Sequence, residues 1–215
     1  MSDHTNNPKA KDMSQVNLAI IYYSSTGTNY TVAKEAQQAA EDAGAEVRLR
    51  KAPELAPDEA IDSNPAWRKH IDETSDVEVA TNDDLEWADA ILFGSPTRFG
   101  NVAAQIKQVI DSAGPLWMEG KLLNKVVSGF TSAQNPNGGQ ESTLLAMYNS
   151  FYHWGAIVVS PAYSDPKLFE SGGNPYGTSI TASSEIPEEK LAAIRIQTNR
   201  VLETAAKLVG AEVEV

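Results

Sequence analysis

A run of hydroxyl side chains follows the apolar segment that ends at Tyr23 and leads into a predicted helix. The run consists of Ser24, Ser25, Thr26, Gly27, Thr28 and Asn29. Backbone N–H groups at a helix N-terminus bind anions, and hydroxyl donors strengthen such a site. The run lacks the lysine of a P-loop and the three glycines of a dinucleotide-binding loop, so it fits a single terminal phosphate held by neutral donors. The alternative is that the hydroxyls only cap the helix.

A second polar loop, residues 95–101, follows another apolar segment and again leads into a predicted helix. Its hydrogen-bond donors are Thr97, Arg98 and Asn101, and Phe99 offers a ring face. A planar polar heterocycle could lie on a loop of this composition. The alternative is an ordinary turn between a strand and a helix with one stray aromatic residue.

A third polar loop runs from Thr131 to Glu141 and contains two glycines. Such a loop can present backbone N–H groups to the carbonyl groups of a ligand. The residues that we expect to contribute are Ser132, Ala133, Gln134, Asn135, Asn137 and Gly138.

Two single residues complete the candidates: His153, before the last short apolar segment, and Trp117 in the element Gly114-Pro115-Leu116-Trp117. Either could line a ligand pocket, although a histidine at a helix end is commonly structural and a lone tryptophan commonly belongs to the core. The other histidines, His4 and His70, have no partner pattern of a metal site, and we expect no metal.

The composition limits the chemistry that these residues can take part in. The chain has 215 residues and no cysteine, which excludes cysteine-ligated zinc, iron–sulfur clusters and thiol redox couples. If the protein moves electrons, a cofactor must therefore carry them. The formal charge of −12 disfavours nucleic acids and anionic membrane surfaces as partners. No segment fits a membrane span, so we expect no stable membrane insertion. The polar residues 1–15 resemble no secretory signal and predict a disordered tail on a cytoplasmic protein.

Five short apolar segments must position the loops, at residues 16–23, 46–50, 89–94, 125–130 and 156–160. The gaps between them are long enough for crossover helices, which predicts parallel strands. Amphipathic helical patterns occupy most gaps: around residues 32–43, from 102 to Gly114-Pro115, over 140–152, and from Pro187 onward. We therefore predict an α/β fold, a doubly wound parallel sheet whose ligands lie beyond the carboxyl ends of the strands.

Two stretches, residues 51–81 and 161–184, fit this alternation poorly. Prolines interrupt the first, where only a short helical turn around residues 83–87 is predicted at its end, and the second is rich in Gly, Pro and Ser. We expect irregular segments that shape a pocket or subunit contacts. Without an internal repeat or a linker, residues 16–210 are predicted to form a single domain, followed by a tail over 211–215.

Several motifs, in this order and spacing, resemble the WrbA-type NAD(P)H:quinone oxidoreductases, which are flavodoxin-like FMN-binding proteins. They are residues 24–29, Gly94 to Asn101, Gly114 to Trp117, Gly138-Gly139-Gln140-Glu141 and Gly172-Gly173-Asn174-Pro175-Tyr176-Gly177. The resemblance extends from Val16 to about Val209. It implies a five-stranded flavodoxin-like sheet in the order 2-1-3-4-5.

The resemblance also implies roles for the candidate residues. Residues 24–29 would hold the FMN phosphate, Thr97, Arg98 and Phe99 would line the isoalloxazine ring, and residues 132–139 would contact its polar edge and the ribityl chain. His153 would lie beside the ring, and Trp117 would wall the pocket where quinone and nicotinamide stack in turn. Members of this family are typically homotetramers with sites completed by neighbouring subunits.

The implied reaction is a two-electron, ping-pong hydride transfer from NADH or NADPH through FMN to a quinone. The flavin supplies the chemistry, so no catalytic acid or base is required, while Arg98 and His153 could stabilise negative charge on the reduced ring. One alternative is a long flavodoxin that carries single electrons between protein partners, which the acidic surface would suit. Another is a flavin-binding module that serves mainly in a protein assembly.

Overall fold

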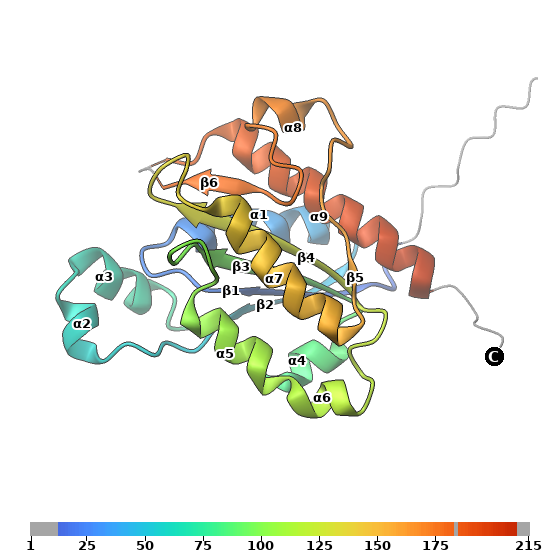
Figure 1. Cartoon of the computed structure of the whole chain (residues 1–215), viewed down its shortest axis with the longest axis horizontal. Helices are drawn as coiled ribbons and strands as arrows, with labels where there is room; N and C mark the ends of the chain where they lie inside the picture. Colours follow the sequence, from blue (N-terminus) through green and yellow to red (C-terminus); the bar gives the residue numbers. More distant parts are fainter. Residues whose placement is uncertain (1–12, 183–184, 210–215) are drawn as a thin grey trace, which may run out of the picture.

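The computed structural model describes residues 13–182 and 185–209 and confirms the predicted doubly wound sheet (Figure 1). Its parallel strands follow the order β2-β1-β3-β4-β5, as in flavodoxins. They are β1 (Asn17–Tyr22), β2 (Glu46–Lys51), β3 (Ala90–Pro96), β4 (Val126–Ala133) and β5 (Ile157–Val158). The apolar residues of β1, β3 and β4 are buried because helices cover both faces of the sheet.

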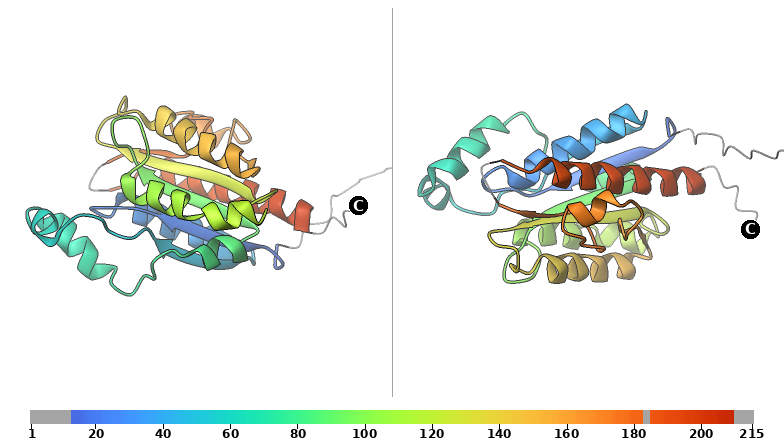
Figure 2. Two further views of the ribbon diagram at one scale, coloured as in Figure 1. Left: turned by 60° about the horizontal axis from the view of Figure 1, so that its bottom comes forward. Right: turned by 90° about the horizontal axis from the view of Figure 1, so that it is seen from above.

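Helices α1 (Thr28–Asp42) and α9 (Glu188–Val209) cover one face, while α5 (Ala104–Ser112) and α7 (Gln140–Trp154) cover the other (Figure 2). Each face has its own hydrophobic core. The periodic apolar residues of α1 pack inward, and Gly44 ends the helix with a φ of +91°, as expected for a helix C-terminus. The layers leave the carboxyl ends of the strands free to carry the polar loops.

The fifth strand differs from the prediction. It is only two residues long, and farther along β4 its place is taken by β6 (Ser179–Thr181), which pairs with residues 131–133 in parallel. The stretch 161–184 is therefore not simply irregular, because it holds α8 (Lys167–Glu170) as well as β6. A three-residue strand is too short to give a periodic signal in the sequence.

Residues 51–81 also contain more regular structure than predicted. They form α2 (Asp58–Asp62) and α3 (Pro65–Glu73), which extend from the carboxyl edge of the sheet (Figure 1). The predicted turn of helix is confirmed as α4 (Asn82–Trp87). The helix expected to end at Gly114-Pro115 instead ends at Ser112, and a separate helix, α6 (Gly114–Met118), follows. These differences arise because Pro65 and Pro115 begin new helices instead of breaking old ones.

The predicted tails lie largely outside the described residues. Of residues 1–15, only 13–15 are described, and there Met13 packs partly buried against the core. Residues 211–215 are not described. The single domain over 16–210 stays a prediction. Among the described helices, none combines the length and apolar character needed to cross a bilayer.

Candidate functional site

The loop after β1 turns at Gly27, which has a φ of +98° and directly precedes α1. The Gly27 N–H donates to Ser24 Oγ at 3.0 Å, and Asn29 Nδ2 donates to the Tyr23 carbonyl at 3.1 Å, so these two side chains hold the loop itself. The hydroxyls of Ser25, Thr26 and Thr28 have no partner among the described residues and do not cap α1. Since the first N–H groups of a helix also lack intrahelical partners, the loop is a cluster of free donors.

The loop after β3 is a tight turn with an exposed aromatic tip. Arg98 and Asn101 exchange backbone hydrogen bonds of 2.8 and 3.0 Å, and the Thr97 N–H donates to the Ser132 carbonyl at 2.8 Å. Phe99 adopts a φ of +54° at the tip, and its ring is fully exposed. A fully exposed phenylalanine ring buries no apolar surface when the chain folds, and a positive φ is unfavourable for this residue. Both features favour a role in contact with a ligand or another molecule.

The loop after β4 lies against the second loop at two glycines. A Cβ on Gly139 would lie 2.8 Å from the Gly100 Cα, so this approach leaves no room for a side chain. Thr143 in the first turn of α7 is fully buried, and its Oγ1 lies 2.8 Å from both Thr97 Oγ1 and the Gly139 carbonyl. Thr143 therefore joins both loops to α7, and the sequence analysis did not identify it.

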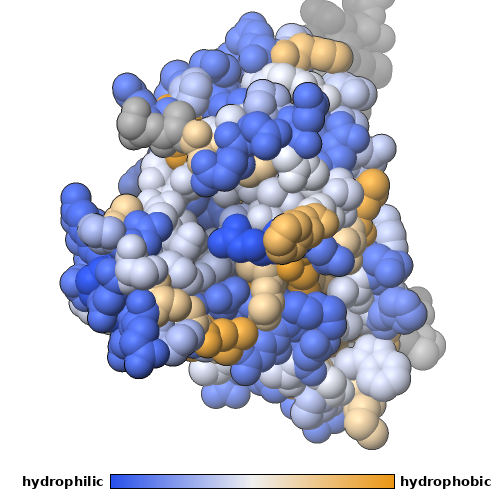
Figure 3. All heavy atoms as spheres, turned by 60° about the vertical axis from the view of Figure 1, so that its left-hand side comes forward, coloured by the Kyte–Doolittle hydropathy of each residue, from blue (hydrophilic) through white to orange (hydrophobic). Residues whose placement is uncertain are grey.

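A cavity of about 520 Å³ opens where the three loops meet, within the size range of cofactor sites. Figure 3 shows this end of the molecule, where hydrophilic and neutral surface prevails. None of the described residues that line it is acidic, although the chain carries a net charge of −12, so the cavity suits an anionic ligand. The predicted residues that line it are Ser24, Ser25, Thr26, Thr28, Thr97, Arg98, Phe99, Ser132, Ala133, Gln134, Asn135 and Gly138.

Four other predicted residues belong to the loops but do not line the cavity. Gly27 and Asn29 shape the first loop, and Asn101 closes the turn of the second. Asn137 faces a neighbouring cavity instead. Gly27, Asn29 and Asn101 therefore hold the conformation of the loops that line the cavity.

Trp117 and His153 lie apart from this cavity within one chain. They line a separate hollow of about 300 Å³, where Trp117 Nε1 donates to the His153 carbonyl at 3.0 Å. The cavity borders the N-terminus of α7, whereas His153 is near its C-terminus, about 20 Å farther along the helix. The expected places of His153 beside a flavin ring and of Trp117 in the same pocket are therefore not found within a single chain.

Two lining residues come from the stretches that were predicted to be irregular. Asn64, the N-cap of α3, and Ala182, directly after β6, border the same cavity. Both positions depend on how distant segments fold back to the sheet edge. No local sequence signal identifies them, apart from the surplus length of the two stretches.

Glu54 links the segment that carries Asn64 to the sheet. Its carboxylate accepts hydrogen bonds from Tyr23 Oη at 3.0 Å, Trp67 Nε1 at 3.1 Å and Gln105 Nε2 at 2.8 Å, and from two backbone N–H groups. Burial alone would raise its pKa, but these donors outweigh burial and hold the pKa of Glu54 below its ordinary value. Burial, with Glu54 nearby, raises the pKa of Tyr23, which remains neutral.

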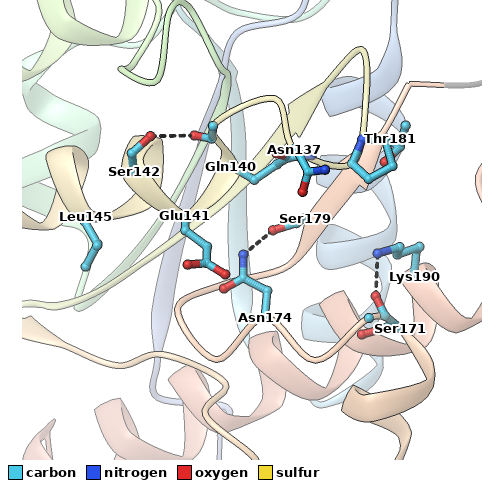
Figure 4. A pocket seen from close by; sticks show the side chains of 13 residues that line it. Asn137, Gln140, Glu141, Ser142, Leu145, Ser171, Asn174, Ser179, Thr181 and Lys190 are labelled. Atoms are coloured by element: carbon cyan, nitrogen blue, oxygen red, sulfur yellow. Dashed lines mark hydrogen bonds between the residues drawn. The ribbon is translucent and has the colours of Figure 1, made fainter.

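A larger cavity of about 660 Å³ lies on the other side of the loop after β4 (Figure 4). Its charged lining residues are Glu141 and Lys190, and Lys190 Nζ donates to the Ser171 carbonyl. Because this cavity holds charges of both signs and does not border the loops after β1 and β3, it fits an anionic cofactor less well than the three-loop cavity does.

Comparisons with known proteins agree with this geometry. The chain matches the family described as NADPH-dependent FMN reductase over residues 16–168. A relative from Deinococcus radiodurans, named NAD(P)H dehydrogenase (quinone), is 53% identical over 91% of this chain and 98% of its own length. One of the same name from Archaeoglobus fulgidus is 40% identical over 89% and 98%. Among solved structures, a flavodoxin, WrbA-like protein from Agrobacterium tumefaciens has a TM-score of 0.63 at 24% identity, covering 89% of this chain and 98% of that one, which shows a common fold.

Proposed function

The chain belongs to the NADPH-dependent FMN reductase family, and on that premise we propose that it reduces quinones with NAD(P)H, using FMN as its cofactor. The observation that carries this proposal is the three-loop cavity. Free hydroxyl donors lie at one end of it, an aromatic and cationic turn borders it, and its described lining residues include no acidic side chain.

The donor set fits FMN part by part. Ser25, Thr26 and Thr28 would hold the phosphate together with the N-terminus of α1, because their hydroxyls have no other partner among the described residues. Thr97, Arg98 and Phe99 would line the ring from one side. The loop over residues 132–138 would contact its polar edge and the ribityl chain.

When bound, FMN supplies two-electron chemistry between a nicotinamide nucleotide and a quinone. The residues of the chain bind and orient, and none needs to act as an acid or base. Arg98 places a cation at the cavity, where it would stabilise negative charge on the ligand. We propose that NAD(P)H and the quinone use the cavity in turn, which is a ping-pong sequence.

We further propose a cytoplasmic homotetramer in which a neighbouring subunit completes each site. Trp117 is more than half exposed and lies with His153 outside the cavity of its own chain, and Met118 beside it is also exposed. Residues of this kind can serve a neighbouring site. Sedimentation analysis should give the mass of four chains, and a stable monomer with full activity would contradict the assembly.

The direct test uses purified protein loaded with FMN. We expect a changed flavin spectrum on binding, reduction by NADH or NADPH, and benzoquinone-dependent reoxidation. Initial rates should give parallel lines in double-reciprocal plots. Protein that binds FMN but shows no NAD(P)H-dependent benzoquinone reduction would refute the proposed activity, and a stable one-electron reduced form would favour the electron-carrier alternative.

A further inference from the structure

One titratable side chain next to the loop over residues 24–29, which we propose to hold the FMN phosphate, has no part in the function proposed above. His70, on α3, is only 7% exposed, and a Cβ on Gly27 would lie 3.6 Å from its Nδ1. Its ring centroid lies 5.6 Å from that of Tyr30 on α1. No ring nitrogen of His70 has a hydrogen-bond partner among the described residues. The imidazole thus packs against the turn at Gly27, within the loop that carries the free donors.

A small cavity of about 240 Å³ adjoins the ring and reaches Ser24 of the loop. The titratable and charged groups around His70 come from four elements and from α3 itself. They are Tyr22 and Tyr23 from the end of β1, Tyr30 from α1, Lys51 from β2, Glu54 from the following loop and Glu73 from α3. The Tyr22 hydroxyl is buried without a partner among the described residues, and Lys51 Nζ donates to the Thr74 carbonyl at 2.6 Å.

We propose that His70 belongs to the phosphate site: its imidazole takes up a proton from solvent when FMN binds and places a positive charge behind the loop that holds the phosphate. The inference rests on the proposed FMN site and deepens it. The hydroxyl and backbone N–H donors of residues 24–29 are neutral. Protonated His70 would add a positive charge beside the phosphate when FMN is bound.

The direction of the pH dependence follows from the surroundings. In the free protein, burial lowers the pKa of His70; Glu73 opposes this and Lys51 adds to it, so the ring is neutral at pH 7. A nearby phosphate favours the charged ring and raises its pKa, by about one pH unit or more for an opposite charge at short range. As the pH falls from the pKa of the FMN-bound protein to that of the free protein, FMN affinity should therefore rise about tenfold for each pH unit between the two values. Above both values His70 is neutral in each state and contributes no charge.

The experiment measures FMN and riboflavin dissociation constants from pH 5.5 to 8.5 for the wild type, His70→Gln and Asp72→Asn. Asp72 is the matched control, because it is exposed on the same helix and its side chain has no partner among the described residues. We expect wild type and His70→Gln to bind FMN within about twofold at pH 8.5. As the pH falls, the wild type should bind progressively more tightly than His70→Gln, and for a pKa rise of about one unit the difference should approach about tenfold once the pH is below the pKa of the free protein. The titration of the free FMN phosphate, near pH 6, affects both proteins alike and cancels in the ratio, whereas an effect of His70 on the bound phosphate is part of the coupling that the ratio measures. Riboflavin lacks the phosphate and should show no such divergence.

A measurement on the wild type alone keeps the inference testable if His70→Gln folds poorly. Calorimetry at pH 7 in two buffers of different ionisation enthalpy should show proton uptake with FMN and none with riboflavin. Equal uptake with both ligands, or a ratio between wild type and His70→Gln that does not change with pH, would overturn the role of His70. Absence of FMN binding at pH 8.5 would instead refute the proposed function, and the inference with it.

Discussion

Glu54 is the residue whose replacement best tests the structure of the cavity wall. Its five hydrogen-bond donors come from the residue after β1, from α3 and α5, and from the local backbone, so one carboxylate fixes the segment that carries Asn64 and His70. Glu54→Gln keeps the shape of the side chain but replaces one acceptor oxygen by an amide donor.

The cost follows from the geometry of these contacts. If the amide oxygen keeps the three donors on Oε1, the new NH2 group faces Tyr23 Oη and Trp67 Nε1. The tyrosine hydroxyl can rotate to accept, whereas the indole N–H cannot and loses its partner. An unsatisfied donor costs about 1–3 kcal/mol, and loss of the charge adds to this; because Glu54 is only half-buried, we expect a loss of about 2–3 kcal/mol. The melting temperature should fall by about 5–10 °C for a chain of this size.

The difference between the two proteins should depend on pH. The folded pKa of Glu54 lies below its unfolded value, so the stability that it contributes is complete above the unfolded pKa, about 4.3, and is lost as the pH falls through the folded pKa. The stability gap between wild type and Glu54→Gln should therefore be full at pH 7 and shrink on acidification below about pH 4, where the protonated carboxyl also carries a donor.

The assay is urea unfolding followed by tryptophan fluorescence, with hydrogen exchange to locate the loss. Protection should fall first over residues 55–73, and FMN affinity should weaken several-fold because that segment borders the cavity. Glu59→Gln is the control, since Glu59 is exposed on α2 and its side chain has no partner among the described residues; it should change stability by less than about 0.5 kcal/mol. Equal stability of Glu54→Gln and Glu59→Gln would contradict the role assigned to the Glu54 carboxylate. So would a stability difference between wild type and Glu54→Gln that does not decrease in acid.

Three further changes test other parts of the site and the sheet. Thr143→Val removes the hydroxyl between Thr97 and the Gly139 carbonyl and should cost about 1 kcal/mol in urea unfolding while weakening FMN binding several-fold; unchanged FMN binding would show that the two loops do not need this link. Gly139→Ala places a Cβ 2.8 Å from the Gly100 Cα at a residue with a φ of +93°, so FMN titration should show at least tenfold weaker binding, and wild-type affinity would contradict the close approach. Gly94→Ala places a Cβ 2.2 Å from Phe130 Cζ in the core and should lower the free energy of unfolding by about 1–3 kcal/mol; a loss below about 0.5 kcal/mol would mean that the ring has room to move.

The parts of the fold that the sequence predicted are those with long periodic signals. The buried strands β1, β3 and β4 and the amphipathic helices α1, α7 and α9 carry such signals. The loops after those strands were also predictable, because the parallel topology alone brings them to one edge. The elements that the sequence did not predict are short: β6 has three residues, and α2 and α3 are short helices that begin at or just after prolines.

The contributions of residues 51–81 and 161–184 depend instead on contacts between distant parts of the chain. Glu54 bonds to Gln105, 51 residues away, and Gln197 on α9 accepts from Thr178 and donates to Ser128 and the Gly129 carbonyl, which fixes the chain that leads into β6. Neither contact follows from spacing or propensity, yet each holds a segment that supplies a cavity residue, Asn64 or Ala182. The surplus length over a minimal five-stranded sheet therefore forms part of the cavity wall, and substitutions that disrupt these long-range contacts should weaken ligand binding as well as lower stability.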